Sequence, residues 1–231
     1  MKRKAIIFLG LTLISSLCWA AGSLDLEDER VRSSYSVGYQ VGGDFIRQGM
    51  EINPEVLMKG IQDGLSGTEP VMSEQEMRQT LVDLNKKVLA LQQEEKLNLA
   101  ERNSAEGKAF LDENGKKGSI KTLSSGLQYE VIKGGAGTPP KTTDTVTVHY
   151  RGTLIDGTEF DSSYKRNAPA TFRLDRVIKG WTEGLQLMQP GAKFLFFIPP
   201  DLAYGEKGAG GTIGPNSTLI FEVELLSVEG S

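Results

Sequence analysis

The sequence predicts an α+β protein, in which helical segments come first and an antiparallel sheet around one short helix follows. Two patterns of apolar residues carry this prediction. Between residues 25 and 114 apolar side chains recur every three or four positions, which is typical of helices. After residue 124 they alternate with polar side chains, which is typical of half-buried strands. The 231 residues are enough for one large domain or two small ones.

Residues 53–67 have a complete set of helix signals. Asn53 is suited to the N-cap, Pro54 to the first turn, and Glu55 to the positive end of the helix dipole. Apolar side chains then recur every four positions, at Leu57, Ile61 and Leu65. Gly67 favours a stop at the C-terminal end.

A shorter helix is predicted just before this one, from the apolar residues Val31, Tyr35, Val37, Val41 and Phe45. We expect it to be interrupted at Gly42-Gly43, because glycine weakens a helix interior. Both helices are short and have narrow apolar faces, so neither can bury itself alone.

A long helix is predicted from Ser73 to Asn114. Ser73 and Glu76 form a capping box, and Asn114-Gly115 provides the stop. About 40 residues at 1.5 Å each give a helix of about 60 Å. Its apolar residues follow a 4-3-4-3 spacing at Met77, Leu81, Leu84, Val88 and Leu91.

The apolar stripe of the long helix ends near Leu99, and residues 94–113 are mostly polar. We therefore expect the second half of this helix to be a solvated spacer. The stripe itself could be an intramolecular core or the seam of a homodimer. Dimerisation through residues 21–99 is favoured, because residues 25–70 offer too little surface to cover the stripe.

The strands are predicted after a linker at Lys116–Ser119. Alternating apolar residues mark three of them, at Leu127/Tyr129/Val131, at Val146/Val148/Tyr150 and at Leu219/Phe221/Val223/Leu225. A fourth strand is Lys193–Ile198, and Asp156-Gly157 is a turn. The helical spacing of Trp181, Leu185 and Met188 predicts one short helix across the concave face of the sheet.

The first 20 residues resemble a Sec-type signal peptide. Lys2, Arg3 and Lys4 precede an apolar stretch, and Cys18 and Ala20 are the small residues before a cleavage site. The stretch is too short to span a bilayer, so we expect no transmembrane segment. The chain from residue 21 onward has 23 basic and 30 acidic residues, a formal charge of −7, and no cysteine. An exported protein without disulfides fits a Gram-negative periplasm or outer surface.

Composition and motifs exclude several kinds of function. A formal net charge of −4 for the full chain argues against nucleic-acid binding. The only histidine, His149, lies on the strand face opposite Tyr150 and has no partners for a zinc site. The glycines of residues 205–211 lack the following Lys-Ser/Thr of a phosphate-binding loop. We expect no metal and no cofactor.

The remaining candidate is an apolar cup formed by aromatic residues in residues 146–226. Taken singly, each of these aromatic residues could be ordinary core. Asp161 lacks a second carboxylate at a defined spacing, so we expect it to orient neighbouring side chains. A concave aromatic surface with a few polar groups suits a proline-containing peptide. The aromatic and acidic residues of this set are Tyr150, Phe160, Asp161, Trp181, Tyr204 and Phe221.

Five motifs follow one another between residues 124 and 228, namely Val148–Gly152, Asp156–Ser162, Val177–Trp181, Asp201–Gly205 and Leu219–Val223. In these motifs and their order, residues 124–228 resemble an FK506-binding-protein (FKBP) peptidyl-prolyl isomerase domain. The preceding helices further resemble the exported, dimeric macrophage-infectivity-potentiator (Mip) type. That second resemblance covers nearly the whole chain, for example at Ser34–Gly38, Asn53–Glu55 and Gly184–Met188.

The resemblance implies a role for each residue of the cup. Trp181 would form its floor, and Tyr204 and the Ile178 amide would donate hydrogen bonds to substrate carbonyls, with Asp161 at the polar rim. The walls would be Tyr150, Phe160, Val177, Ile178 and Phe221, and Phe172 and Ile213 would be further substrate-binding positions. The catalytic residues would be Tyr150, Phe160, Asp161 and Tyr204. The chain departs from the family at Ala209, where the best-known member has a histidine, and at Ala170, where an aromatic residue is frequent. These departures concern the rim and therefore substrate preference.

The implied function is prolyl isomerisation that assists the folding of exported, proline-containing polypeptides, with macrolides of the FK506/rapamycin type as inhibitors. The alternative is a holdase chaperone or host-interaction protein whose main function lies in the helical arms. The expected organisation is a signal peptide (1–20), a helical dimerisation domain (21–72), a connecting helix (73–114) and an isomerase domain (115–231). The expected location is the periplasm or the outer-membrane surface.

Overall fold

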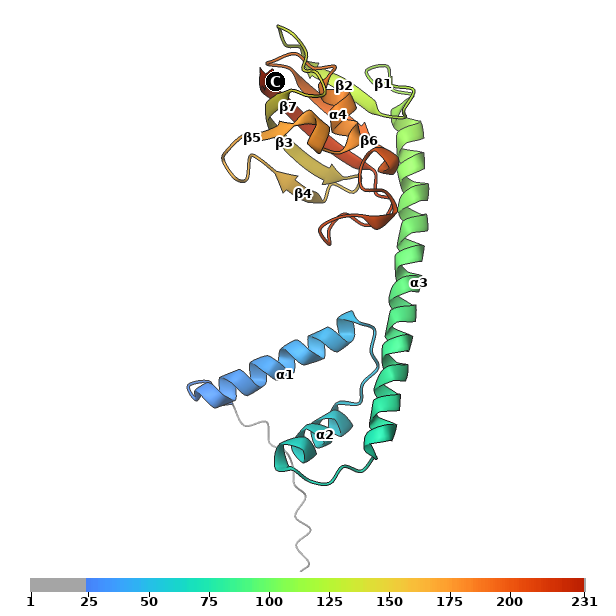
Figure 1. Cartoon of the computed structure of the whole chain (residues 1–231), viewed down its shortest axis with the longest axis vertical. Coiled ribbons are helices and arrows are strands. Elements are labelled where there is room, and N and C mark those ends of the chain that lie inside the picture. Colours follow the sequence, from blue (N-terminus) through green and yellow to red (C-terminus); the bar gives the residue numbers. More distant parts are fainter. Residues whose placement is uncertain (1–23, 231) are drawn as a thin grey trace, which may run out of the picture. The chain divides into compact units, whose positions relative to one another are not determined.

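The computed structural model describes residues 24–230, so the predicted signal peptide lies outside the described residues. Within the described range the chain divides into two units, residues 24–73 and residues 74–230. The first unit contains two helices, and the second contains a long helix and the sheet (Figure 1).

Helix α1 (Glu29–Arg47) begins the first unit, and Asp28 caps it by accepting a hydrogen bond from the Arg30 amide at 2.8 Å. The helix runs without a break through Gly42-Gly43, so the predicted interruption is wrong. Glycine lowers helix propensity by about 1 kcal/mol but keeps both backbone hydrogen-bonding groups, so a helix can continue through it.

Helix α2 (Pro54–Ser66) confirms the predicted signals at both ends. Asn53 Oδ1 accepts hydrogen bonds from the amides of Glu55 and Val56, at 3.0 and 3.2 Å. At the other end Gly67 adopts a left-handed conformation with φ of 63°, and its N–H bonds a carbonyl of the last turn. Local chemistry therefore fixes the position of this helix.

Neither helix of the first unit contains a buried residue. On α1 the rings of Tyr35 and Tyr39 stack with 6.2 Å between centroids, yet the two side chains are 56% and 76% exposed. Ile46 and Leu65 are more exposed still. Burying apolar area is the main source of helix stability in proteins, so these faces lack the cover that isolated helices of this length need.

Helix α3 (Glu74–Asn114) opens the second unit and has the predicted extent. Its second half is not a free spacer, because one stripe of it is covered at Leu99, Asn103, Gly107, Phe110 and Asn114. The Phe110 ring lies 5.9 Å from that of Phe197, and Asn114 Nδ2 donates to Gln128 Oε1 at 2.9 Å. The expectation of a solvated half was wrong because Leu99 and Phe110 share this stripe with polar residues and a glycine, whose contacts a hydrophobic pattern does not register.

The sheet of the second unit is antiparallel throughout, in the order β1-β2-β6-β7-β3-β4, with β5 also paired to β3. Its strands are β1 (Lys121–Thr122), β2 (Gln128–Lys133), β3 (Thr145–Leu154), β4 (Glu159–Ser162), β5 (Ala170–Arg173), β6 (Lys193–Ile198) and β7 (Leu219–Glu229). The predicted α+β class and the four predicted strands are confirmed. The short strands β1, β4 and β5 were not predicted from the pattern of the sequence.

Alternation places the core on one face of the sheet. On β3 the buried residues are Val146, Val148 and Tyr150, and on β7 they are Leu219, Phe221, Val223 and Leu225. The two strands pair along their length, with Tyr150 opposite Val223. Period-two alternation and register together bring the apolar sides of both strands onto the same face.

Helix α4 (Lys179–Leu185) crosses this apolar face (Figure 1). It lies very close to β6, because Gly180 and Gly184 face the sheet. A Cβ atom at Gly180 would lie 2.5 Å from Ile198 Cγ2, and one at Gly184 would lie 2.6 Å from Phe196 Cε1. The two glycines therefore set the depth at which α4 sits, and with it the depth of Trp181 on the same helix.

Three short 3₁₀ helices lie in the connections of the second unit, η1 (Leu174–Arg176), η2 (Pro200–Leu202) and η3 (Gly205–Lys207). No helix among residues 24–230 combines the length and the apolar character needed to cross a bilayer.

Candidate functional site

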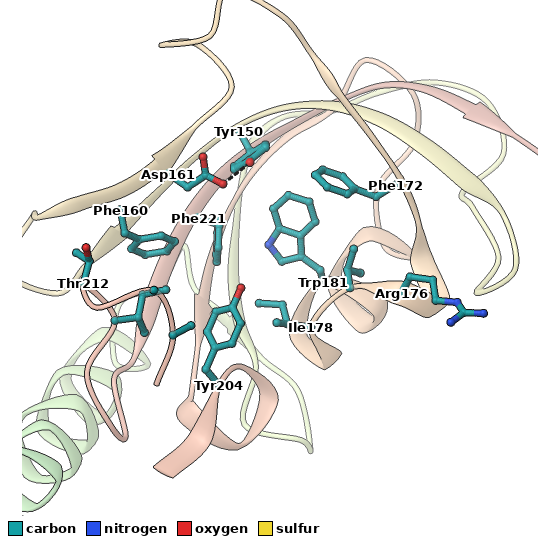
Figure 2. A pocket seen from close by; sticks show the side chains of 14 residues that line it. Tyr150, Phe160, Asp161, Phe172, Arg176, Ile178, Trp181, Tyr204, Thr212 and Phe221 are labelled. Carbon is teal, nitrogen blue, oxygen red and sulfur yellow. Dashed lines mark hydrogen bonds between the residues drawn. The ribbon is translucent and has the colours of Figure 1, made fainter. Parts of the chain in front are cut away.

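A cavity of about 590 Å³ opens between α4, the concave face of the sheet and the loop before β7 (Figure 2). Its lining contains every site residue predicted from the sequence. Those residues are Tyr150, Phe160, Asp161, Phe172, Val177, Ile178, Trp181, Tyr204, Ile213 and Phe221. They come from β3, β4, β5, β7, α4 and loops, so only the tertiary fold brings them together.

Trp181 forms the floor of the cavity and is 4% exposed. Three rings meet it edge to face, Tyr150 at 5.2 Å, Phe221 at 5.2 Å and Phe172 at 5.5 Å between centroids. This geometry is favoured because the positive edge of one ring meets the negative face of another. Trp181 Nε1 is buried without a hydrogen-bond partner in the described protein, so the floor has an unused donor.

Phe160 and Phe221 form one wall, with their rings 5.4 Å apart and nearly perpendicular. Room for this pair comes from Gly152 on β3. A Cβ atom at Gly152 would lie 2.6 Å from the Phe160 ring and 2.7 Å from the Phe221 ring. The glycine of the first motif is therefore explained by the close approach of two aromatic rings.

The polar rim is built by Tyr150, Asp161 and Arg166. The Tyr150 hydroxyl donates to Asp161 Oδ2 at 2.5 Å, as Figure 2 shows. Arg166 donates to both partners, through Nη1 to Asp161 Oδ1 at 2.5 Å and through Nη2 to the Tyr150 oxygen at 2.7 Å. The prediction that Asp161 orients neighbouring side chains agrees with this geometry, and Arg166 closes the network.

The rim environment moves the pKa values of Tyr150 and Asp161 further from neutral pH. Burial raises the pKa of Tyr150 above its usual 10.0, and the hydrogen bond to Asp161 raises it further. Burial also acts to raise the pKa of Asp161, but the hydrogen bonds from Tyr150 and Arg166 outweigh it and lower that pKa below 3.8. At neutral pH the tyrosine is therefore protonated and the aspartate ionised, and neither is poised to transfer a proton.

Besides Trp181 Nε1, two hydrogen-bond donors nearer the cavity mouth remain available to a ligand. Tyr204 is 40% exposed, and its hydroxyl has no hydrogen-bond partner among residues 24–230. Figure 2 shows this side chain at the cavity mouth, with its oxygen directed inward. The Ile178 amide, at the N-cap of α4, likewise donates to no acceptor within the described range. Both groups suit the carbonyl oxygens of an extended peptide.

A loop closes the cavity on the side of Tyr204. Ala209 and Ile213 exchange two backbone hydrogen bonds, at 2.8 and 3.0 Å, and Ala209, Gly210, Thr212 and Ile213 line the cavity. Ala209, where the resembled family's best-known member has histidine, thus lies in the wall. A methyl group there leaves the mouth of the cavity without an aromatic or ionisable side chain at this point.

Sequence reasoning missed three side chains at the site. Arg166 belongs to the rim network, while Arg176 and Thr212 line the cavity, as does the unpredicted Gly210. Arg166 follows Asp161 by five residues, and a basic residue shortly after a predicted rim carboxylate was a usable signal. Arg176 ends the three-residue helix η1 and Thr212 lies in a loop, so no period indicates which way either side chain points.

His149 is separate from the cavity. Its ring stacks on Tyr164 with 4.9 Å between centroids, and Nδ1 hydrogen-bonds Ser163 Oγ at 3.0 Å. Among the residues that the structure describes, no group of three or more His, Cys, Asp or Glu side chains could hold a metal ion. The cavity thus offers shape, aromatic surface and hydrogen-bond donors.

Comparison with protein families gives two matches that together span most of the chain. Residues 136–226 match the family described as "FKBP-type peptidyl-prolyl cis-trans isomerase". Residues 30–131 match the family described as "Domain amino terminal to FKBP-type peptidyl-prolyl isomerase". The first match ends within β2 and the second begins just after it.

Similar whole proteins have the same two-part organisation in sequence. "Outer membrane protein MIP" from Legionella longbeachae is 46% identical over 229 residues, which cover 99% of this chain and 98% of that protein. "Peptidyl-prolyl cis-trans isomerase Mip" from Coxiella burnetii is 45% identical, with 99% of each chain covered. The crystal structure of FkpA from Escherichia coli superposes with a TM-score of 0.72 at 41% identity, covering 88% of this chain and 98% of that one.

Proposed function

Because the chain belongs to the FKBP-type peptidyl-prolyl cis-trans isomerase family, with relatives of the Mip and FkpA kind, we propose that it isomerises X-Pro bonds in the cavity above Trp181. The observation that carries the assignment to this cavity is the aromatic enclosure around Trp181. Three aromatic rings meet the Trp181 floor edge to face, and two unpaired donors lie at the mouth. A proline ring with its flanking carbonyls has the matching shape and polarity.

Isomerisation requires that the planar amide be twisted. Rotation about a peptide bond costs about 18–20 kcal/mol, because twisting ends the amide resonance. The twisted amide has a less dipolar carbonyl than the planar one. A dry aromatic cavity therefore binds the twisted form better than the planar ground state, and this differential binding lowers the barrier. No proton transfer is needed, in agreement with a rim whose groups do not titrate near neutral pH.

The hydrogen-bond donors position the peptide while the bond turns. In this proposal Tyr204 and the Ile178 amide hold carbonyls on either side of the proline, and Trp181 lies under its ring. Tyr150, Phe160, Phe172, Val177, Ile213 and Phe221 form the walls, with Asp161 at the rim. Holding the peptide on both sides of the proline restricts its motion to rotation about the X-Pro bond, which lowers the entropic part of the barrier.

We infer that the natural substrates are proline-containing segments of exported polypeptides. Residues 1–20 have the features of a signal peptide, and a similar protein from Legionella longbeachae is named an outer membrane protein. Both observations support a periplasmic or outer-membrane location. Slow X-Pro isomerisation limits the folding of many chains, which gives an isomerase in that compartment a clear use.

The helical unit is proposed as a homodimerisation domain, with residues 21–72 at its centre and residues 73–99 contributing from the long helix. The support is the apolar surface that α1 and α2 leave uncovered, including Tyr35, Tyr39 and Ile46. A dimer would carry two cavities, so a client with several prolines would be held by both. Light scattering on the full chain should give twice the monomer mass.

Macrolides of the FK506/rapamycin type are proposed as competitive ligands of the same cavity. Trp181 offers a direct probe of their binding, because a protein that begins at Ala21 retains Trp181 as its sole tryptophan. We expect a saturable change in tryptophan fluorescence on titration, and competition between macrolide and prolyl peptide. A macrolide that binds without inhibiting would place its site outside the cavity.

The test of the proposed function is a protease-coupled prolyl-peptide assay on the protein that begins at Ala21. Tyr204→Phe and Trp181→Leu should lower kcat/KM, whereas Tyr129→Phe should leave it unchanged. Tyr129 lies on β2, stacks on Phe194 of β6 and does not line the cavity, so Tyr129→Phe is a matched control. If kcat/KM of Tyr204→Phe and Trp181→Leu equals that of the control Tyr129→Phe, the assignment of the reaction to this cavity is refuted.

A further inference from the structure

We propose that Asn103 of helix α3 is a positioning residue for the isomerase cavity, and that the long helix therefore sets the activity of the site. Asn103 does not line the cavity. It contacts the segment that follows the cavity-lining loop, within the same compact unit. The inference rests on the proposed function, because Asn103 acts through the walls of that cavity.

The primary contact is a hydrogen bond from a helix side chain to a loop carbonyl. Asn103 Nδ2 donates to the Pro215 oxygen at 2.8 Å and lies 3.4 Å from Ser217 Oγ. A second bond runs the other way, from Asn216 Nδ2 to the Ala100 carbonyl at 3.5 Å. Pro215 is buried, so its carbonyl needs a protein partner to offset the loss of water.

Residues 214–218 are the base of the loop that closes the cavity. The backbone N–H of Asn216 donates to the Gly205 carbonyl at 2.8 Å, and this bond joins the end of the loop to the residue after Tyr204. Between these two points the chain folds back at Ala209 and Ile213. A displacement at Pro215 would therefore move both the Ile213 wall and the backbone beside Tyr204.

The helix approaches this base closely because residue 107 is glycine. A Cβ atom at Gly107 would lie 2.4 Å from Thr218 Oγ1 and 3.3 Å from Thr218 Cβ. Thr218 is 3% exposed and directly precedes β7, which carries Phe221 into the cavity. Gly107 and Asn103 are one helical turn apart, so one face of α3 contacts both the end of the loop and the start of the strand.

Leu99 completes this face at the next turn. A Cβ atom at Gly214 would lie 3.0 Å from Asn103 Nδ2 and 3.2 Å from Leu99 Cδ2, so the loop backbone packs directly on both side chains. Figure 1 shows the loop before β7 beside α3. The match to the isomerase family begins at residue 136, after the end of α3. The helix therefore lies outside the segment that carries the isomerase motifs.

The experiment uses the protein from Ala21 to Ser231 and two substitutions at Asn103. Asn103→Ala removes the donor, and Asn103→Asp keeps the shape but places an acceptor against the Pro215 carbonyl. Asn98→Ala is the matched control, because Asn98 is an exposed residue of the same helix. kcat and KM are measured well below the melting temperature of each variant, with amide hydrogen exchange at Ala209 and Ile213.

We expect both Asn103 variants to lower kcat/KM about three- to tenfold, mainly through KM, as the loss of one hydrogen bond predicts. Exchange at the Ala209 and Ile213 amides should accelerate in both, and Asn98→Ala should match the wild type. Gly107→Ala should act in the same direction by a different route, whereas Gly60→Ala, on an exposed face of α2, should not.

Two results would overturn the proposal. One is kcat/KM in both Asn103 variants equal to that of Asn98→Ala. The other is a loss that tracks only the folded fraction, with Ala209 and Ile213 still protected, which would make Asn103 a general stability residue. Tyr204→Phe measured in the same assay separates the two levels. If neither Tyr204→Phe nor the Asn103 variants lower kcat/KM, the assignment of the reaction to the cavity fails. If Tyr204→Phe lowers kcat/KM and the Asn103 variants do not, only the role of Asn103 fails.

Discussion

The Tyr150 hydroxyl donates a hydrogen bond to Asp161 Oδ2 at 2.5 Å, and this contact joins β3 to β4 at the rim of the cavity. Arg166 donates to both residues and lies with its guanidinium carbon 5.5 Å from the centre of the Tyr150 ring. The three side chains hold one face of the aromatic enclosure by polar contacts, while edge-to-face packing holds the rest.

Replacing Tyr150 by phenylalanine should lower both activity and stability. The ring would keep its contacts with Trp181 and Phe221, but Asp161 and Arg166 would lose a shared partner. We expect kcat/KM to fall about three- to tenfold and the free energy of unfolding to fall by about 1 kcal/mol, the usual scale for one hydrogen bond. Prolyl-peptide assays and urea unfolding measure the two effects. Unchanged kcat/KM would show that the rim network does not serve the reaction.

Replacing Tyr204 by phenylalanine should separate activity from stability completely. The hydroxyl makes no hydrogen bond within residues 24–230, so its removal should change the free energy of unfolding by less than about 0.5 kcal/mol. If it binds a substrate carbonyl, kcat/KM should still fall about tenfold. Urea unfolding and the peptide assay on the same preparation provide the test. A large loss of stability would point to a structural role for the hydroxyl.

Gly152→Ala should damage the cavity wall. The added methyl group would overlap the rings of Phe160 and Phe221, which cannot both move away without leaving their packed positions. Overpacking of this kind costs about 1–3 kcal/mol in the free energy of unfolding. Activity should fall as well, because both rings face the cavity.

The matched control for Gly152→Ala is Gly134→Ala, since a Cβ atom there would meet no atom within 4 Å. It should leave both the melting temperature and kcat/KM at wild-type values. Equal behaviour of the two variants would mean that the Phe160–Phe221 wall tolerates displacement.

The pH dependence of the reaction should be flat around neutrality. The pKa of Asp161 lies below 3.8 and that of Tyr150 above 10.0, so the rim keeps one charge state between them. kcat/KM for an uncharged peptide should vary less than about twofold from pH 6 to pH 9. A bell-shaped profile in this range would contradict catalysis by binding alone.

Acid should destabilise the rim in a defined direction. Asp161 has a lowered pKa in the folded state, so its contribution to stability is present above pH 3.8 and is lost as pH falls through the folded value. In Asp161→Asn this part of the pH dependence should disappear. Thermal unfolding at pH 7 and at about pH 3 compares the two proteins. The melting temperature of each protein falls by some amount between pH 7 and pH 3. If that fall is equal in the wild type and in Asp161→Asn, Asp161 does not contribute to the acid sensitivity of the fold.

Local sequence signals predicted much of the fold. The ends of α2 follow from Asn53 and Gly67, because capping depends on residues within a few positions of each other. The faces of β3 and β7 follow from period-two alternation. The strands β4 and β5 have only four residues each, too few for a period to show. Their existence depends on pairing with β3, a contact between distant segments.

The candidate site divides in the same way. The resemblance to a known family assigned all ten predicted lining residues, while periodicity alone left each aromatic residue as possible core. Arg166, Arg176 and Thr212 were not found, because side chains in loops and in the three-residue helix η1 have no period that shows their direction. The packed stripe on α3 was also missed. Asn103 and Gly107 are polar or small, and a hydrophobic pattern does not register contacts made through a hydrogen bond or a missing side chain.

The sequence by itself determined the class of the protein, the positions of its capped helices and the faces of its long strands, because these depend on neighbours along the chain. The tertiary structure alone decided the edge-to-face arrangement above Trp181, the network of Tyr150, Asp161 and Arg166, and the contact of Asn103 with Pro215. These contacts join residues up to 112 positions apart. Their geometry is set by packing of the whole unit, which no local pattern encodes.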